Sequence, residues 1–233
     1  MEDMSSKYKG RREEIEKFFE VADVVAGSEQ EHTSPSKHYK LMIEEYSKGP
    51  GTWSYSRGRV YDLNNQIVAD IKRNYGIFWH CWFQHPNGYE YLLCGEDYQG
   101  YTFVNLTKGT VQTYFPEGAY NGAGFCWAKV FPSEDGKLLA VDGCYWACPY
   151  ALVLYDFNDP ESLPLNELLR VEDLNDSEGW KNNNTFIMTR EIECRKNDGV
   201  PYADLDEEEQ DRLDSNSSLV EYINETVEVK WPQ

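Results

Sequence analysis

One stretch of the chain is repeated, and this repeat limits what the chain can fold into. Residues 76–98 read GIFWHCWFQHPNGYEYLLCGEDY, and residues 124–146 read GFCWAKVFPSEDGKLLAVDGCYW. The two stretches align without a gap at a constant offset of 48 residues, with glycines and aromatic residues matched at several positions. Self-similarity at such a period indicates stacked supersecondary units, each of which buries its apolar face against a neighbour.

The two copies carry the same turn signal at the same place. Asn87-Gly88 in the first copy meets Asp135-Gly136 in the second, and alternating apolar residues flank both pairs. Such dipeptides between alternating runs are the strongest short-range signal for a β-hairpin. We therefore predict two equivalent hairpin turns, each inside a unit of four antiparallel strands.

Four-stranded units of this length resemble the blades of a β-propeller of the WD40-like kind. The resemblance predicts blade-like units over 38–73, 76–120 and 124–173, with a weak fourth over 181–233. No Gly-His pair starts a unit and no Trp-Asp pair ends one. The predicted fold class is mainly β: antiparallel β-meander repeats forming a propeller-like domain, either incomplete or four-bladed, with an N-terminal helix. The stretch 132–164 is also similar to uncharacterised bacterial and viral proteins, which implies no activity.

The predicted domain organisation is simple. Residues 1–30 are expected to form an N-terminal helix and a linker, and residues 31–233 a single β-repeat domain. Ile15, Phe18 and Phe19 recur at helical spacing, so one side of the helix is apolar. We expect this side to pack on an edge of the sheet, because exposed edges need covering.

The charge of the chain limits its partners. Its formal net charge is −19, and nucleic acids and anionic membranes need a basic surface. We therefore expect no direct nucleic-acid or membrane contact, and a protein partner, in particular one with a basic surface. The N-terminus is charged throughout and lacks the apolar run of a signal peptide, which predicts a cytoplasmic protein.

Two cysteines, Cys144 and Cys148, lie close together in the stretch GCYWACPY. A structural zinc site normally needs a second pair of cysteine or histidine ligands, and no such pair is present. A redox pair would have the spacing Cys-x-x-Cys at the start of a helix. The sequence thus predicts neither a metal site nor a cofactor, and it indicates reduced cysteines that fill space in the interior.

The candidate site follows from the repeat. In a propeller, the connections between the second and third strands of neighbouring blades lie side by side, which would bring aromatic and charged residues onto one surface. The alternative is that these aromatic residues only pack the blades together. The residues predicted to bind are Trp53, Tyr55, Arg57, Glu96, Asp97, Tyr98, Asp142, Tyr145 and Trp146.

The most consistent function is a non-enzymatic, acidic binding protein that engages a protein partner through these connections. The common motifs for nucleophilic, phosphate-binding, zinc-protease and dinucleotide chemistry are absent from the sequence, so no catalytic residue is assigned. Three alternatives stay open. One is a small-ligand binder that stacks carbohydrate-like molecules on aromatic rings. Another is a hydrolase with carboxylates at Glu96 and Asp97, and the last is a viral or regulatory inhibitor that occludes a basic surface.

Overall fold

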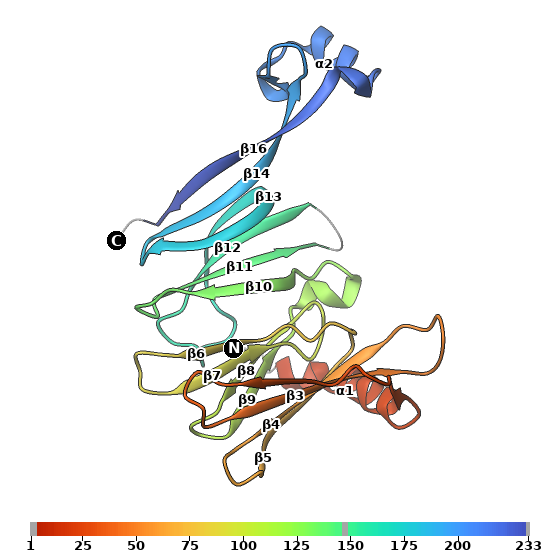
Figure 1. Cartoon of the computed structure of the whole chain (residues 1–233), viewed down its shortest axis with the longest axis vertical. Helices are drawn as coiled ribbons and strands as arrows, with labels where there is room; N and C mark the ends of the chain where they lie inside the picture. Colours follow the sequence, from red (N-terminus) through yellow and green to blue (C-terminus); the bar gives the residue numbers. More distant parts are fainter. Residues whose placement is uncertain (1–3, 146–148, 232–233) are drawn as a thin grey trace.

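Three antiparallel sheets follow one another along the chain and stack in that order in the computed structural model (Figure 1). The structure describes residues 4–145 and 149–231. The first sheet contains β1 (Asp23–Val24), β2 (Gln30–Thr33), β3 (Lys40–Ser47), β4 (Tyr55–Tyr61) and β5 (Ile67–Arg73). The second contains β6 (Cys81–Gln84), β7 (Glu90–Cys94), β8 (Tyr101–Asn105) and β9 (Thr110–Tyr114). The third contains β10 (Cys126–Pro132), β11 (Leu138–Cys144), β12 (Tyr150–Asp156), β13 (Glu167–Asn182), β14 (Thr185–Arg195), β15 (Val200–Pro201) and β16 (Val220–Lys230).

The repeat is present in the structure, and its two hairpin turns are confirmed. In the first copy the amide of Gly88 donates to the carbonyl of His85 at 3.0 Å, and in the second the amide of Gly136 donates to that of Ser133 at 3.0 Å. These bonds join positions exactly equivalent under the repeat. Both glycines have positive φ angles, +90° and +67°, which side chains of L-residues rarely tolerate.

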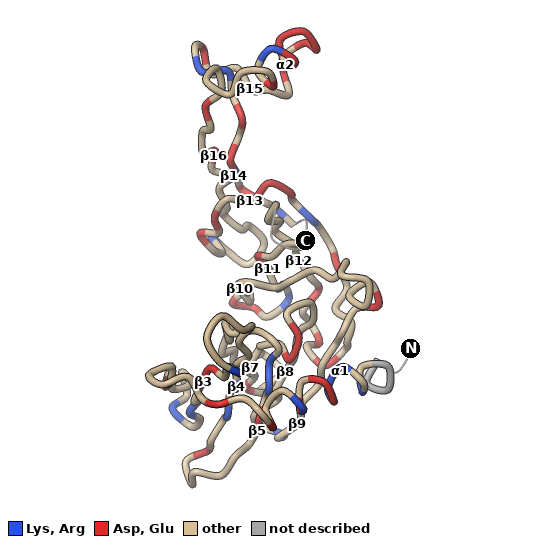
Figure 2. Tube along the Cα trace, turned by 90° about the vertical axis from the view of Figure 1, so that its right-hand side faces the viewer, with Lys and Arg blue, Asp and Glu red and all other residues tan. Residues whose placement is uncertain are grey.

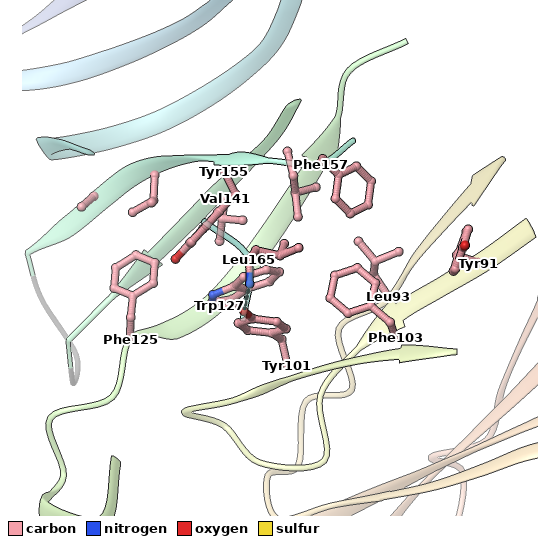
Figure 3. Close-up of a cluster of buried hydrophobic side chains, with 13 residues drawn as sticks. Tyr91, Leu93, Tyr101, Phe103, Phe125, Trp127, Val141, Tyr155, Phe157 and Leu165 are labelled. Carbon is pink, nitrogen blue, oxygen red and sulfur yellow. Dashed lines mark hydrogen bonds between the residues drawn. The ribbon is translucent and has the colours of Figure 1, made fainter. Parts of the chain in front are cut away.

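Two apolar cores hold the three sheets together. The first and second sheets share a core that includes Leu41, Ile71 and Leu92. The second and third sheets share a core of large aromatic residues (Figure 3), in which the rings of Tyr101 and Trp127 stack at 4.1 Å. Strands β7, β8, β11 and β12 are buried on both faces, because the second and third sheets are covered on both sides.

The predicted fourth unit over 181–233 forms no sheet of its own among the described residues. Strand β13 pairs with β12 along one part of its length and with β14 along another, and β16 pairs with β14, so the third sheet simply continues. Phe186, Met188 and Val229 pack against Leu152 and Leu154 on the outer face of the same sheet. Strands β14 and β16 thus bury the outer apolar face of the third sheet, which a fourth blade would otherwise bury.

Beyond this core the β14–β16 ribbon extends away from the sheets as an arm. The arm carries β15 and the short helix α2 (Glu207–Asp214) at its tip (Figure 1). Asp206 begins this helix, because its side chain accepts a hydrogen bond from the amide of Glu209. Figure 2 shows acidic residues along the arm and at its tip.

The predicted N-terminal helix is present as α1 (Met4–Phe19). It packs near β5 and β9, where Tyr8 stacks on Phe115 at 4.8 Å and Phe18 stacks on Tyr55 at 3.7 Å. The segment expected to be only a linker also contains β1 and the start of β2, which both pair with β3. Among the described residues, no helix combines the length and the apolar composition needed to cross a membrane.

Candidate functional site

A cavity of about 950 Å³ lies among residues that come from all three sheets and their connections. Trp53 precedes β4, Tyr75 and Trp79 lie in the connection between β5 and β6, and Tyr98 follows β7. The third sheet contributes residues from β10 to β14, and these include Trp127, Lys129, Asp142, Tyr150 and Glu191. The cavity is therefore a product of sheet stacking and belongs to no single unit.

Six aromatic side chains line this cavity. On one side the rings of Trp53 and Tyr75 lie 5.4 Å apart, and the ring of Tyr98 lies 6.4 Å from that of Tyr75. On another side the indoles of Trp79 and Trp127 lie 6.1 Å apart. The sixth aromatic residue is Tyr150. Trp53 and Tyr150 keep substantial exposure, at 54% and 39%, so the aromatic lining reaches the protein surface.

Asn74 forms hydrogen bonds with two of the aromatic residues that line the cavity, Trp53 and Tyr98. Its backbone carbonyl accepts a hydrogen bond from the indole N–H of Trp53 at 3.0 Å, and its side-chain oxygen accepts one from the amide of Tyr98 at 3.0 Å. Gly76 also permits close approach, because a Cβ atom there would lie 2.5 Å from the Ser54 hydroxyl. These contacts hold together the connections β3–β4, β5–β6 and β7–β8, and their aromatic residues lie on the same side of the cavity.

Asp142 places a carboxylate at the cavity. The residue is only 4% exposed, and its Oδ1 atom has no hydrogen-bond partner among the described residues. Its Oδ2 atom lies 3.9 Å from the ammonium of Lys129, a distance too long for a hydrogen bond. Burial raises the pKa of Asp142, and the positive charge of Lys129 and the hydroxyl of Ser177 act against that rise.

A second polar atom at the cavity also lacks a partner. The indole N–H of Trp79 is buried and makes no hydrogen bond to any described residue. Leaving a buried donor unsatisfied costs about 1–3 kcal/mol. Two residues of the cavity lining, Asp142 and Trp79, thus each have a buried polar atom without a hydrogen-bond partner among the described residues.

Arg73 lies at the cavity but already has its partners. Its guanidinium donates to the carbonyls of Ile77 at 2.9 Å, Gly95 at 2.8 Å and Asp97 at 3.1 Å. Burial lowers the pKa of Arg73 to about 10, so the side chain is still positively charged at neutral pH. Its role is to join the connections of the first and second sheets.

Three of the nine predicted site residues line the cavity: Trp53, Tyr98 and Asp142. The repeat predicted that connections from different units come together, and for these three residues the structure brings them together. Trp146 lies outside the described residues, so its prediction stays as it was. The other five lie elsewhere, and the reasons differ.

Glu96 and Asp97 bind the N-terminal helix instead of lining the cavity. The guanidinium Nε of Arg12 lies 2.9 Å from Glu96 Oε2, and that of Arg11 lies 2.8 Å from Asp97 Oδ2. Asp97 is fully buried and also accepts hydrogen bonds from the side chain of Asn74 and, at 2.9 Å, from the amide of Gln99. Burial raises the pKa of Glu96, and Arg12 acts against this. Carboxylates that are buried and paired in this way do not form an accessible hydrolytic site.

Tyr55 and Arg57 are also used within the structure. Tyr55 stacks on Phe18 of α1, and Arg57 donates two hydrogen bonds to Asp70 on the neighbouring strand, one of them at 2.7 Å. Both residues belong to β4, and neither lines the large cavity.

Tyr145 lies outside the large cavity as well. Its ring packs edge to face on Phe125 at 5.2 Å, and the guanidinium of Arg170 lies 5.1 Å from its centre. Tyr145 lines a smaller cavity of about 250 Å³.

Residue-by-residue reasoning missed Tyr75, Trp79, Trp127 and Tyr150 as lining residues. For two of them the signal was in the sequence, because Trp79 and Trp127 occupy equivalent positions of the repeat. Equivalent positions of adjacent stacked units come close together, and here they face one cavity. Tyr75 and Tyr150 have no equivalent aromatic residue in the other copy of the repeat, so the sequence did not single them out.

The cysteines beside the cavity are thiols. Cys126 and Cys144 are directly opposite each other on β10 and β11, and neither is in a disulfide bond. Among the described residues, no group of three or more histidine, cysteine, aspartate or glutamate side chains is placed to hold a metal ion. Cys148 lies outside the described residues.

Comparison with known proteins gives both a relative and structural neighbours. An uncharacterised protein of Acanthamoeba polyphaga mimivirus is 39% identical over 144 residues, which are 61% of this chain and 56% of that protein. The chain thus spans little more than half the length of this relative. No protein-family model matches the chain.

One of the solved structures that resemble this chain is a β-propeller domain. The β-propeller domain of Swd1 from Myceliophteria thermophila is similar with a TM-score of 0.42 at 13% identity, over 85% of this chain and 54% of that one. Prolyl oligopeptidase B from Galerina marginata is similar with a TM-score of 0.41 at 11% identity, over 70% of this chain and 22% of that one. The blade-like repeats in the sequence predicted a similarity of this kind.

Proposed function

We propose that this chain is a binding protein that recognises another protein through the aromatic cavity. The observation that carries the proposal is the cavity lining itself, in which six aromatic side chains from the three sheets and their connections share one cavity with the buried carboxylate of Asp142. Tryptophan and tyrosine dominate the binding energy of protein interfaces because they bury large surfaces at low cost in conformational entropy. An acidic chain also favours a partner with a basic surface.

The cavity would receive a protruding part of the partner. Trp53 and Tyr150 are exposed enough to contact an approaching protein, whereas Trp127 is only 3% exposed. A projecting side chain would then become buried among aromatic rings, as the anchors of protein interfaces do. A lining that combines exposed and buried aromatic rings suits this mode of binding.

The test is affinity capture from a lysate of the native source with three forms of the protein. The wild type is compared with a Trp53→Ala/Tyr150→Ala double variant, and with a Tyr222→Ala/Ile223→Ala variant as the matched control. Tyr222 and Ile223 are exposed apolar residues on the arm, outside the cavity. We expect a stoichiometric partner with the wild type and the control, and its loss with the cavity variant. Equal capture by all three forms would contradict the proposal.

A small-molecule ligand is the second candidate, and the size of the cavity favours it. Ligand sites of proteins usually have volumes of about 300–1,000 Å³, and this cavity lies within that range. Sugars stack on exposed tryptophan rings, which Trp53 offers. Quenching of tryptophan fluorescence by a neutral sugar, lost in Trp53→Ala, would favour this candidate over a protein partner.

The acidic arm supports a third reading, occlusion of a basic surface. Its helix α2 begins with Glu207, Glu208 and Glu209, and Figure 2 shows further acidic residues along the arm. Complex formation through such a surface would fall steeply with salt concentration. It would also persist in the Trp53→Ala/Tyr150→Ala variant, which separates it from recognition at the cavity.

A further inference from the structure

The charges at the cavity favour a positively charged ligand. Three carboxylates line it, from Asp142, Asp173 and Glu191, against two cations. One of these cations, Arg73, is held by three backbone carbonyls. The other, Lys129, keeps more than half of its side chain in solvent and lies closer to Asp176 than to Asp142. Neither cation makes a close contact with the Asp142 carboxylate.

Asp142 is the strongest single indication. A buried carboxylate normally has several donors around it, because an unpaired buried charge is costly. Here Oδ1 has no partner among the described residues, and the nearest cation to Oδ2 is at 3.9 Å. An ammonium or guanidinium group entering the cavity would supply a closer opposite charge than Lys129 does.

The aromatic lining suits the same kind of group. Cations are attracted to the faces of tryptophan and tyrosine rings within about 6 Å, most strongly where water is excluded. The protein already contains such a contact here, since the guanidinium of Arg73 lies 5.9 Å from the centre of the Tyr75 ring. The aliphatic part of a long basic side chain would also bury apolar surface against these rings.

We infer that the cavity takes up a lysine or arginine side chain of the partner protein, with its cationic end at Asp142 and its aliphatic part against the aromatic lining. This inference rests on the proposed function, because it assumes that the cavity is the recognition site. The net charge of −19 would draw a basic segment toward the protein before contact. Lys129, at the edge of the site, competes weakly for Asp142 and would be displaced toward Asp176.

The inference can be tested with short peptides that differ only in charge. The probes are acetyl-Gly-Arg-Gly-amide and its citrulline counterpart, which has nearly the same shape and no charge, together with the lysine and norleucine peptides. Binding is followed by the indole N–H signals in ¹H–¹⁵N NMR spectra, which detect millimolar affinities. We expect the charged peptides to bind about tenfold more tightly than the neutral ones, a difference of about 1.4 kcal/mol.

Two variants assign the effect to the cavity. Asp142→Asn keeps the shape of the side chain and removes its charge, so the preference for arginine over citrulline should disappear. Asp70→Asn is the matched control, because Asp70 pairs with Arg57 outside the cavity, and it should leave the preference unchanged. Asp142→Asn should fold normally, because it relieves the cost of a buried charge; thermal unfolding checks this.

The outcomes separate this inference from the proposed function. If citrulline and arginine peptides bind equally well, the preference for a cation is overturned, while recognition at the cavity stands. If the charged peptides bind but Asp142→Asn retains the full preference, the assigned position of the cation is overturned. If no peptide shifts an indole signal and the captured partner does not depend on Trp53 and Tyr150, both proposals fall.

Discussion

The guanidinium of Arg11 lies 2.8 Å from the carboxylate of Asp97, which is fully buried beneath the N-terminal helix. Two residues 86 positions apart thus join α1 to the connection that follows β7. The neighbouring pair, Arg12 and Glu96, repeats the arrangement with the residue after Arg11 and the residue before Asp97. Glu96 and Asp97, which we predicted as binding residues, therefore attach the helix to the second sheet.

The first prediction concerns this attachment. Arg11→Ala should lower the free energy of unfolding by about 2–3 kcal/mol, because it leaves the Asp97 carboxylate buried without its positive partner. Arg57→Ala is the control, since its partner Asp70 is partly exposed, and it should cost at most about 1 kcal/mol. Urea unfolding of the three proteins measures both values. Equal losses for the two variants would show that the Arg11 pair does not hold the helix.

The second prediction concerns the pH dependence of stability. Burial raises the pKa of Asp142 in the folded protein above its ordinary value, with Lys129 acting against the rise and Asp176 adding to it. A carboxyl group with a raised pKa stabilises the fold when protonated, and this contribution is lost as the pH rises through the raised value. Asp142→Asn should therefore gain stability relative to the wild type across that interval, and keep a constant advantage above it.

Unfolding curves for the wild type and Asp142→Asn, recorded from about pH 4 to about pH 8, measure this difference. Asp176→Asn is a suitable control, because that carboxylate is exposed and paired with Lys129. A stability difference between wild type and Asp142→Asn that stays flat over the whole range would contradict the prediction.

The third prediction concerns the two equivalent turns. Replacing either Gly88 or Gly136 with alanine should cost about 1 kcal/mol, because both have positive φ angles. Gly136→Ala should cost clearly more, since a Cβ atom there would lie 2.5 Å from Pro86, whereas the space at Gly88 is open. Thermal unfolding of the two variants ranks them. A larger loss for Gly88→Ala would mean that the turns of the two units do not pack on each other.

The fourth prediction concerns the continuation of the third sheet. Phe186→Ala should cost about 3–5 kcal/mol, because this side chain is fully buried against the outer face of that sheet. Ile223→Ala, on the exposed part of the partner strand, should change stability by no more than about 0.5 kcal/mol. Chemical denaturation of both variants distinguishes the covering part of the ribbon from the protruding arm. A small loss for Phe186→Ala would show that the ribbon does not cover the sheet.

Much of the fold could be predicted from the sequence, because it depends on local signals. The turn dipeptides, the alternation of apolar residues and the offset between the two copies all act over a few residues, and Asn87-Gly88 and Asp135-Gly136 form the expected turns. The helical spacing of Ile15 and Phe18 likewise predicted an apolar side that becomes buried. These features need no knowledge of distant contacts.

The site was predicted only in part, because its residues are brought together by packing between units. Trp53, Tyr98 and Asp142 line the cavity, whereas Glu96 and Asp97 beside them pair with arginines from α1. No local sequence pattern distinguishes an exposed carboxylate from one that pairs with an arginine more than eighty residues away.

By itself, the sequence determined the strands, the turns and the repeating unit, since backbone preferences and apolar alternation are properties of neighbouring residues. Only the tertiary structure decided that the last strands continue the third sheet, because Phe186 and Val229 gain more from covering its apolar outer face than from starting a new sheet. It also decided which aromatic residues share the cavity with Asp142, because that depends on how three separately formed sheets stack.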